Sequence, residues 1–106
     1  MATYDDFSKL EIRVGTVVDV KDHPDADKLY VLTVDIGTET RQIVAGMKKY
    51  YTPEEIKGKQ IAVIVNLDPA VIRGVESQGM LLAAEKGKKV VLLGVDKEIG
   101  NGARVC

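Results

Sequence analysis

The side chains best suited to binding lie between residues 66 and 84. Four of them carry hydrogen-bond donors: Asn66, Arg73, Ser77 and Gln78. Amide, hydroxyl and guanidinium groups donate to phosphate and sugar oxygens, and a guanidinium can donate two hydrogen bonds in parallel. The stretch is too long and too polar for a hairpin turn, which usually needs about two to five residues. We therefore expect a long loop, held between two strands of a small barrel, that presents a binding surface.

A metal site is not supported around the only histidine. His23 is followed by Asp25 and Asp27. One imidazole and two loop carboxylates match neither the ligand count nor the spacing of a zinc or calcium motif. Turn chemistry explains these residues better, because aspartate is frequent in turns. We therefore expect no metal.

Catalytic and nucleotide-binding patterns are incomplete. The spacing of Gly74 to Gly79 would open a P-loop, yet Met80 and Leu81 stand where that motif requires Lys and Ser or Thr. Ser77 lacks the flanking residues of a nucleophile elbow and has no histidine near it in sequence. Residues 35–38 are similar to a phosphate-binding turn of large ATPases, but a hairpin turn explains them in so short a chain. We expect no catalytic residue and no cofactor.

Length and composition predict one domain, residues 1–106. Of these residues 45% are hydrophobic, and no apolar run approaches the roughly 20 residues that span a bilayer. Residues 1–6 are acidic and do not match a secretory signal, so we expect a cytoplasmic protein. The single cysteine, Cys106, cannot form an internal disulfide, which fits a reducing compartment.

Charge is distributed unevenly along the chain. The formal net charge of −1 argues against a protein that coats nucleic acid non-specifically, because such binding needs many phosphate contacts. Residues 1–40 carry four Lys or Arg and nine Asp or Glu, whereas residues 41–106 carry eleven and seven. The second part can therefore form a basic face. Its clustered lysines, for which simple solvation is the alternative, are Lys48, Lys49, Lys57, Lys59, Lys86, Lys88 and Lys89.

Alternating apolar and polar residues predict a series of strands. Gly15 marks a bulge or bend in the first of them. A helix begins at Thr52, where Pro53 fits the first helical position and Glu55 completes a capping box. Gly58 ends this helix after little more than a turn. The predicted strands cover residues 11–20, 29–36, 41–45, 60–65, 80–84 and 90–95.

This order of elements predicts an all-β fold. Three strands, a short helix and two more strands form an OB-fold, a five-stranded Greek-key barrel. The apolar run at 90–95 and the tail at 99–105 exceed what five strands need. We expect this C-terminal extension to cover a sheet edge or to meet a second copy of the chain.

The composition favours structured RNA over a single strand. OB-folds that bind single strands use several aromatic stacking surfaces, whereas this chain has one Phe, four Tyr and no Trp. The same shortage disfavours an oligosaccharide. Recognition through shape, phosphates and ribose hydroxyls needs fewer aromatic rings, and Lys28 and Arg73 can supply cations for it. We expect moderate, salt-sensitive affinity.

Four motifs, at residues 10–15, 23–30, 44–55 and 66–84, cover nearly the whole chain. Together they resemble the tRNA-binding domain of methionyl-tRNA synthetases, both as a C-terminal domain and as a free-standing β subunit. The resemblance implies a non-catalytic homodimer that binds the outer corner of tRNA with little sequence preference. Such a module assists aminoacylation by the catalytic chain of the synthetase. The tRNA-binding residues that the resemblance implies are Lys28, Asn66, Arg73, Ser77 and Met80.

Simpler roles compete with three of these assignments. Met80 begins an apolar strand, where a core position is the usual role. Asn66 can cap the loop backbone, and Ser77 can close a turn. Arg73 and Lys28 are the stronger candidates, because a cation beside a phosphate has a direct role.

The chain departs from the family within this loop. Lysine is common in relatives at the position of Asp68, and basic residues often stand at Ala70 and Val71. The presumed contact surface therefore has less positive charge here. Binding is then weaker than in relatives, or relies more on Lys48, Lys49 and Lys59.

The alternative function belongs to another class. Single-domain secretion chaperones share this fold and bind unfolded peptides in a cleft of the dimer. The run from Ser77 to Met80 and the motif from His23 to Tyr30 favour the tRNA-binding hypothesis, because we expect the chaperones to differ there.

Overall fold

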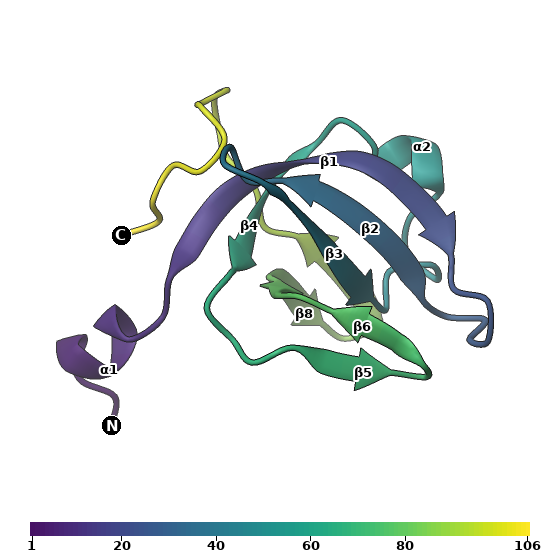
Figure 1. The fold of residues 1–106 in the computed structure, drawn as a ribbon, viewed down its shortest axis with the longest axis horizontal. Coiled ribbons are helices and arrows are strands. Elements are labelled where there is room, and N and C mark those ends of the chain that lie inside the picture. The colour runs from purple at the N-terminus through teal and green to yellow at the C-terminus, as the bar shows by residue number, and fades with distance from the viewer.

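The computed structural model describes residues 1–106 as nine strands and two short helices (Figure 1). Five strands form the main sheet, and four make two hairpins. The main sheet, in spatial order, contains β3 (Thr40–Ala45), β2 (Tyr30–Asp35), β1 (Ile12–Asp22), β4 (Gln60–Ile64) and β7 (Met80–Leu81). The other elements are the hairpins β5 (Ala70–Ile72) with β6 (Val75–Ser77) and β8 (Ala83–Lys86) with β9 (Lys89–Leu92), and the helices α1 (Tyr4–Ser8) and α2 (Pro53–Ile56).

The main sheet curls into a nearly closed barrel, in which the edge strands β3 and β7 contact each other. Gln78, just before β7, completes the closure. Its backbone N–H donates to the carbonyl of Gln42 on β3 (2.7 Å), and its side-chain oxygen accepts from the Gln42 N–H (3.0 Å). The predicted all-β barrel, with its helix between the third and fourth strands, is confirmed.

Alternating side chains fill the barrel. In β2, Tyr30, Leu32 and Val34 are buried, whereas the residues between them are partly exposed. β4 is different, because its last four residues are all buried. Its second face, at Ala62 and Ile64, packs in a smaller apolar cluster with residues of β1 and of the C-terminal tail.

The bulge predicted near Gly15 lies further along β1. The register of β1 against β2 shifts between Val17 and Asp19, so the exposed Val18 is the extra residue. Gly15 has another role, since a Cβ there would stand 2.6 Å from Cγ1 of Val34. The predicted position was therefore wrong, because the glycine reflects the close packing of β1 on β2.

Both helices begin with a capping box. At α2 the predicted start is confirmed, and the Glu55 carboxylate accepts a hydrogen bond from the backbone N–H of Thr52 (2.8 Å). This bond holds the pKa of the Glu55 carboxyl below its ordinary value. We predicted no helix at α1, where Thr3 and Asp6 make the same pair of contacts. Neither helix has the length and apolar character needed to cross a membrane.

The C-terminal tail covers a sheet edge, as expected. Residues 102–105 run antiparallel to the first part of β1. The N–H of Gly102 donates to the carbonyl of Val14 (2.7 Å), and the N–H of Val105 donates to that of Ile12 (2.9 Å). Because β1 pairs with β2 only from Thr16 onward, the tail occupies an edge that would otherwise be open.

Candidate nucleic-acid interface

The predicted long loop contains a hairpin of its own. Residues 70–77, here called the signature hairpin, form the antiparallel strands β5 and β6. Only Arg73 and Gly74 make the turn between the paired residues Ile72 and Val75, and Figure 1 shows this turn at the lower right of the molecule. The prediction of a long loop did not include this hairpin, because strands of three residues are too short to show a clear alternation.

Arg73 adopts a backbone conformation that side chains rarely take. Its φ is +53°, and Gly74 follows with a φ of +88°, as in a type I′ turn. Type I′ turns favour Asn-Gly, and the left-handed conformation costs a residue with a Cβ about 1–2 kcal/mol. No other non-glycine residue in the chain has a positive φ. Because such strain clusters at functional sites, it marks this exposed turn as a candidate for binding.

The loop between β1 and β2, residues 23–29, supports the turn. Nδ1 of the buried His23 accepts a hydrogen bond from the backbone N–H of Asp25 (2.9 Å), and Nε2 lies 2.9 Å from the Ile72 carbonyl. Nε2 therefore carries the proton and donates it to this carbonyl. Arg73 in turn donates from Nη2 to the Asp25 carbonyl (3.2 Å). The sequence did not reveal this role of His23, because its partner lies 49 residues away.

Lys28 and Arg73 come together beside the signature hairpin. They line an open hollow of about 360 Å³ that also contains Asp25 and Asp27. Both cationic side chains are exposed, and neither forms an ion pair. Because the two carboxylates cancel their formal charge, this hollow offers hydrogen-bond donors without a strong positive field.

Asn66 and Ser77 use their polar groups within the chain. Ser77 is only 4% exposed, and its Oγ accepts from the N–H of Val44 (3.0 Å) and donates to a carbonyl two residues later (3.0 Å). Asn66 accepts from the N–H of Glu11 (2.7 Å) and donates to the carbonyl of Lys9 (2.7 Å). Ser77 therefore closes a turn, the simpler role considered for it, whereas Asn66 binds the backbone just before β1 and not the backbone of its own loop.

Met80 lies at the surface where β7 begins. The residue is 48% exposed, although its backbone pairs with Ile64 of β4. Gly79 makes this approach possible, because a Cβ there would stand 2.9 Å from the Ile64 carbonyl oxygen. Met80 is therefore outside the core, and its thioether can contact a ligand.

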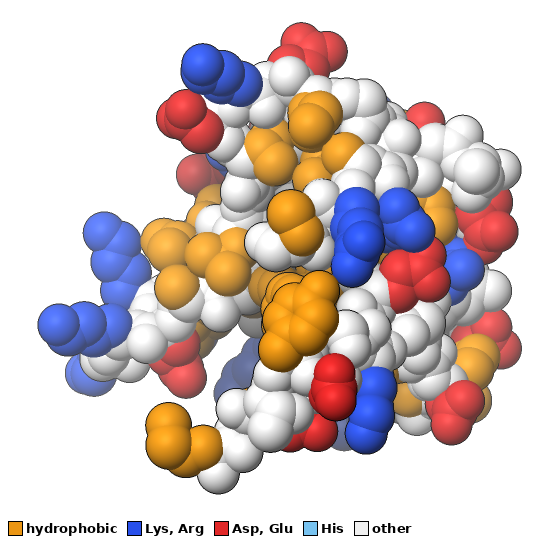
Figure 2. All heavy atoms as spheres, turned by 90° about the vertical axis from the view of Figure 1, so that its left-hand side faces the viewer, with side chains coloured by type: hydrophobic (Ala, Val, Ile, Leu, Met, Phe, Trp, Pro, Cys, Tyr) orange, Lys and Arg blue, Asp and Glu red, His pale blue; other side chains and the backbone are white.

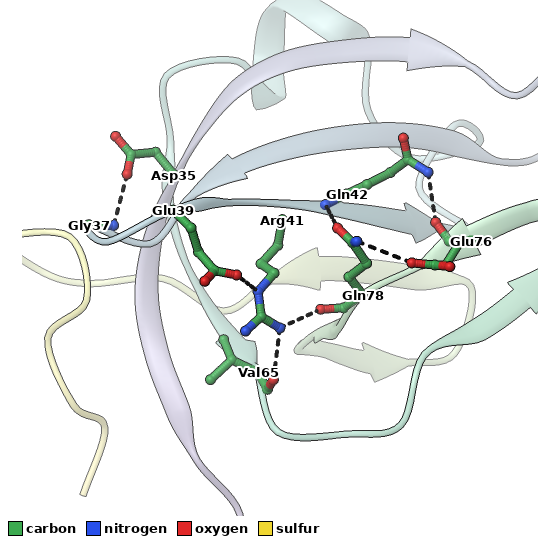
Figure 3. A network of polar contacts seen from close by, with 8 residues as sticks. All are labelled: Asp35, Gly37, Glu39, Arg41, Gln42, Val65, Glu76 and Gln78. Atoms are coloured by element: carbon green, nitrogen blue, oxygen red, sulfur yellow. Dashed lines mark hydrogen bonds and ion pairs between the residues drawn. The ribbon is translucent and has the colours of Figure 1, made fainter.

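Arg41, which the sequence analysis did not single out, ties together the two ends of residues 66–77, the segment that carries the signature hairpin. Its Nη1 donates to the carbonyls of Val65 (2.9 Å) and Gln78 (3.0 Å), which lie at the two ends of that segment. Its Nε pairs with Glu39, as Figure 3 shows. An arginine within a predicted strand carries no signal of such a contact, so sequence reasoning had no means to find it.

The chain is similar to proteins of one known family. A family model described as "Putative tRNA binding domain" matches residues 12–104. The chain belongs to this tRNA-binding domain family. The methionine--tRNA ligases of Thermococcus kodakarensis and Thermotoga maritima are 57% and 52% identical to it, each over 97% of this chain. The tRNA-binding domain spans only 14% and 16% of the length of these relatives.

Two solved structures match this tRNA-binding domain over its whole length. A MetRS-related protein from Pyrococcus horikoshii has a TM-score of 0.94 and 42% identity, with 98% of that chain covered. The chaperone CsaA from Bacillus anthracis has a TM-score of 0.91 and 32% identity, with 99% covered. Because both share the barrel, the fold alone does not separate their functions.

The tRNA-binding domain presents a single cation on its signature hairpin. Besides Arg73, the exposed positions include Val71, which stands opposite Glu76. Asp68 and Ala70 are exposed as well and add no positive charge. Neutralising the phosphate charge requires cations, so strong RNA binding by this domain has to use cations from other elements.

Proposed function

We propose that the chain is a non-catalytic module that binds structured tRNA with little sequence preference. The observation that carries the proposal is the strained Arg73 turn, which His23 and the Asp25 backbone hold in one conformation. A fixed, exposed guanidinium can donate to a phosphate at a reduced entropic cost of binding. Contacts to phosphate and ribose depend on RNA shape and carry little information about the bases. The module is one domain, residues 1–106, and acts in the cytoplasm.

We assign two kinds of role to the five candidate residues. Lys28, Arg73 and Met80 contact the RNA, a role that their exposure supports. Asn66 and Ser77 act as positioning residues, because their polar groups are hydrogen-bonded within the chain. The contact surface is therefore smaller than the family pattern suggests.

The catalytic chain of a methionyl-tRNA synthetase is the protein partner in this proposal. The two methionine--tRNA ligases carry the matching stretch as a small part of a much longer chain. A second contact to tRNA raises its effective concentration at the catalytic chain. Aminoacylation is thus assisted by binding alone, without a cofactor or a catalytic group from this module.

A homodimer through the face that carries α1 is a further part of the proposal. Figure 2 shows apolar side chains grouped on this side of the molecule, with charged side chains around them. Tyr4, Phe7 and Leu10, in α1 and directly after it, are exposed apolar residues of this region. Exposed apolar patches mark interaction surfaces, and a dimer would double the contacts to RNA.

Phe7→Asp is expected to convert the dimer into a monomer at micromolar concentration. A carboxylate placed in an apolar interface loses its hydration without gaining a partner. Sedimentation velocity measures the change. Val18→Asp is the matched control, because Val18 is equally exposed (41% against 40%) but lies on the bulge of β1. A wild-type chain that sediments as a monomer contradicts the proposed dimer.

Peptide binding by a secretion chaperone is the second candidate function. Besides the protein from Bacillus anthracis, the CsaA chaperone protein from Picrophilus torridus is similar, with a TM-score of 0.92 and 33% identity. We favour tRNA, because Lys28 and Arg73 are exposed hydrogen-bond donors beside the signature hairpin and neither forms an ion pair. Capture of an unfolded peptide relies instead on an apolar groove or an open sheet edge.

A gel-shift titration separates these two functions. Bulk tRNA, double-stranded DNA and an unfolded polypeptide are each offered at low and at moderate salt. We expect retention of tRNA in preference to DNA, with an affinity that falls as salt rises. We also expect no competition from the polypeptide. Failure to retain tRNA at low salt contradicts the proposed function, and displacement of tRNA by the polypeptide supports the chaperone.

A further inference from the structure

Lysines that are far apart in sequence meet beside the β8–β9 hairpin. Lys49 and Tyr50 precede α2, and Lys88 and Lys89 belong to the turn and the start of β9. Together they line an open hollow of about 400 Å³, here called the lysine hollow. The rest of its lining consists of Tyr51, Val90 and Val91, so no carboxylate lines it.

Hydrogen bonds fix the two sides of the lysine hollow against each other. The hydroxyl of Tyr51 accepts from the backbone N–H of Leu92 on β9 (3.0 Å). The carbonyl of Tyr51 accepts from the hydroxyl of the buried Tyr30 (2.7 Å). Val90 and Leu92 pack against the main core. The lysines therefore extend from a fixed frame rather than from a mobile tail.

The positive charge of this surface is not neutralised within the chain. Lys89 stands directly opposite Lys86 in the ladder, a placement that is unfavourable for like charges. Glu85 stands opposite Val90 and so shares the face of that residue, but it does not line the hollow and forms no ion pair with these lysines. Lys48 is paired with Asp22 (3.1 Å), whereas Lys49 and the lysines of the hairpin have no ion pair.

The lysine hollow lies at the same end of the barrel as the loop 23–29, which supports the signature hairpin. Tyr30, which directly follows the loop 23–29, pairs with Ala45, which directly precedes the segment 46–51. The ion pair between Asp22 and Lys48 joins the two connections. One rigid ligand can therefore reach from the Arg73 turn to the lysine hollow along this end of the barrel.

We propose that the lysine hollow holds a second stretch of sugar-phosphate backbone of the tRNA bound at the signature hairpin. This inference rests on the proposed function. Phosphates would relieve the repulsion between Lys86 and Lys89 and release counterions, which is the main source of affinity for RNA. The hydroxyl of Tyr50, which has no hydrogen-bond partner in the chain, can donate to a phosphate or a ribose. The hollow thus supplies the positive charge that the signature hairpin lacks.

The test compares the triple variant Lys49→Ala, Lys88→Ala and Lys89→Ala with a control of equal charge, Lys21→Ala, Lys97→Ala and Arg104→Ala. All six side chains are exposed, so we expect both variants to fold. Binding of bulk tRNA is measured over a series of salt concentrations. We expect the slope of log affinity against log salt to fall in magnitude by about 2–3 in the lysine-hollow variant. The control should keep the wild-type slope.

Hydroxyl-radical footprinting of the bound tRNA provides a second readout. We expect two protected stretches of backbone, of which the lysine-hollow variant loses one and an Arg73 variant loses the other. If the wild type protects tRNA and the lysine-hollow variant matches its control in slope and footprint, this inference is wrong while the proposed function stands. If the wild type itself binds no tRNA, the proposed function fails first.

Discussion

Arg73→Asn is expected to stabilise the chain while it weakens tRNA binding. Asparagine tolerates the left-handed conformation that arginine adopts at φ +53°, so the free energy of unfolding should rise by about 1 kcal/mol. The same change removes the guanidinium from the exposed turn. A hydrogen bond to a charged group contributes about 1.5–3 kcal/mol, so affinity should fall roughly 10-fold or more. Opposite signs for stability and binding are the signature of strain retained for function.

Denaturant unfolding and tRNA titration of the same preparations measure both effects. Arg73→Lys is the matched control, because it keeps the charge and the strained backbone but lacks the planar fork. Its stability should equal that of the wild type, and its affinity should lie between the other two. A less stable Arg73→Asn variant, or one that binds tRNA as well as the wild type, would show that the turn is merely structural.

His23→Ala is expected to reduce both stability and affinity, although His23 itself is buried away from the RNA. The substitution removes the acceptor for the Asp25 N–H and the donor to the Ile72 carbonyl. Leaving such groups without partners costs about 1–3 kcal/mol. The Arg73 turn then loses its fixed position, and binding by the intact guanidinium becomes entropically less favourable. Urea unfolding and the gel shift measure the two losses.

Asp25→Asn changes the charge of the hollow around Lys28 and Arg73 without changing the hydrogen bonds that hold the Arg73 turn. Asp25 contacts His23 and Arg73 through its backbone only, so both hydrogen bonds should survive this change. Loss of the carboxylate gives the hollow a net positive charge, and the affinity for tRNA should therefore rise. If a His23→Ala variant binds tRNA with the affinity of the wild type, His23 has no role in binding.

Much of the barrel was predictable from local patterns. The predicted strands at 29–36 and 41–45 match β2 and β3, and the capping box at Thr52 marked the one helix within the barrel. Features that depend on contacts distant in sequence were not predictable. The close approach of Gly15 to Val34 is one example, since the glycine alone suggested a bulge. A hydrophobic pattern records which face is buried, but it does not record which neighbour lies there.

The candidate site shows the same division. Arg73 and Lys28 were predicted from the sequence to contact phosphate. The support that His23 gives to the Arg73 turn was not, because it depends on the backbone carbonyl of Ile72, which no sequence motif specifies. The clustered lysines were visible in the sequence. Their proximity in space was not, because Lys49 is brought to Lys88 and Lys89 by the contact of Tyr51 with β9. The exposed groups of the site were therefore easier to predict from the sequence than the residues that position them.

The pairing of residues 102–105 with β1 has a consequence for synthesis on the ribosome. The open edge of β1 is paired by residues made about 90 positions later, because Arg13 pairs with Arg104. A nascent chain therefore carries an unpaired strand edge until the tail has emerged from the exit tunnel. During that interval neighbouring nascent chains can associate through this edge, so we expect slow translation of residues 102–105 to favour aggregation over productive folding.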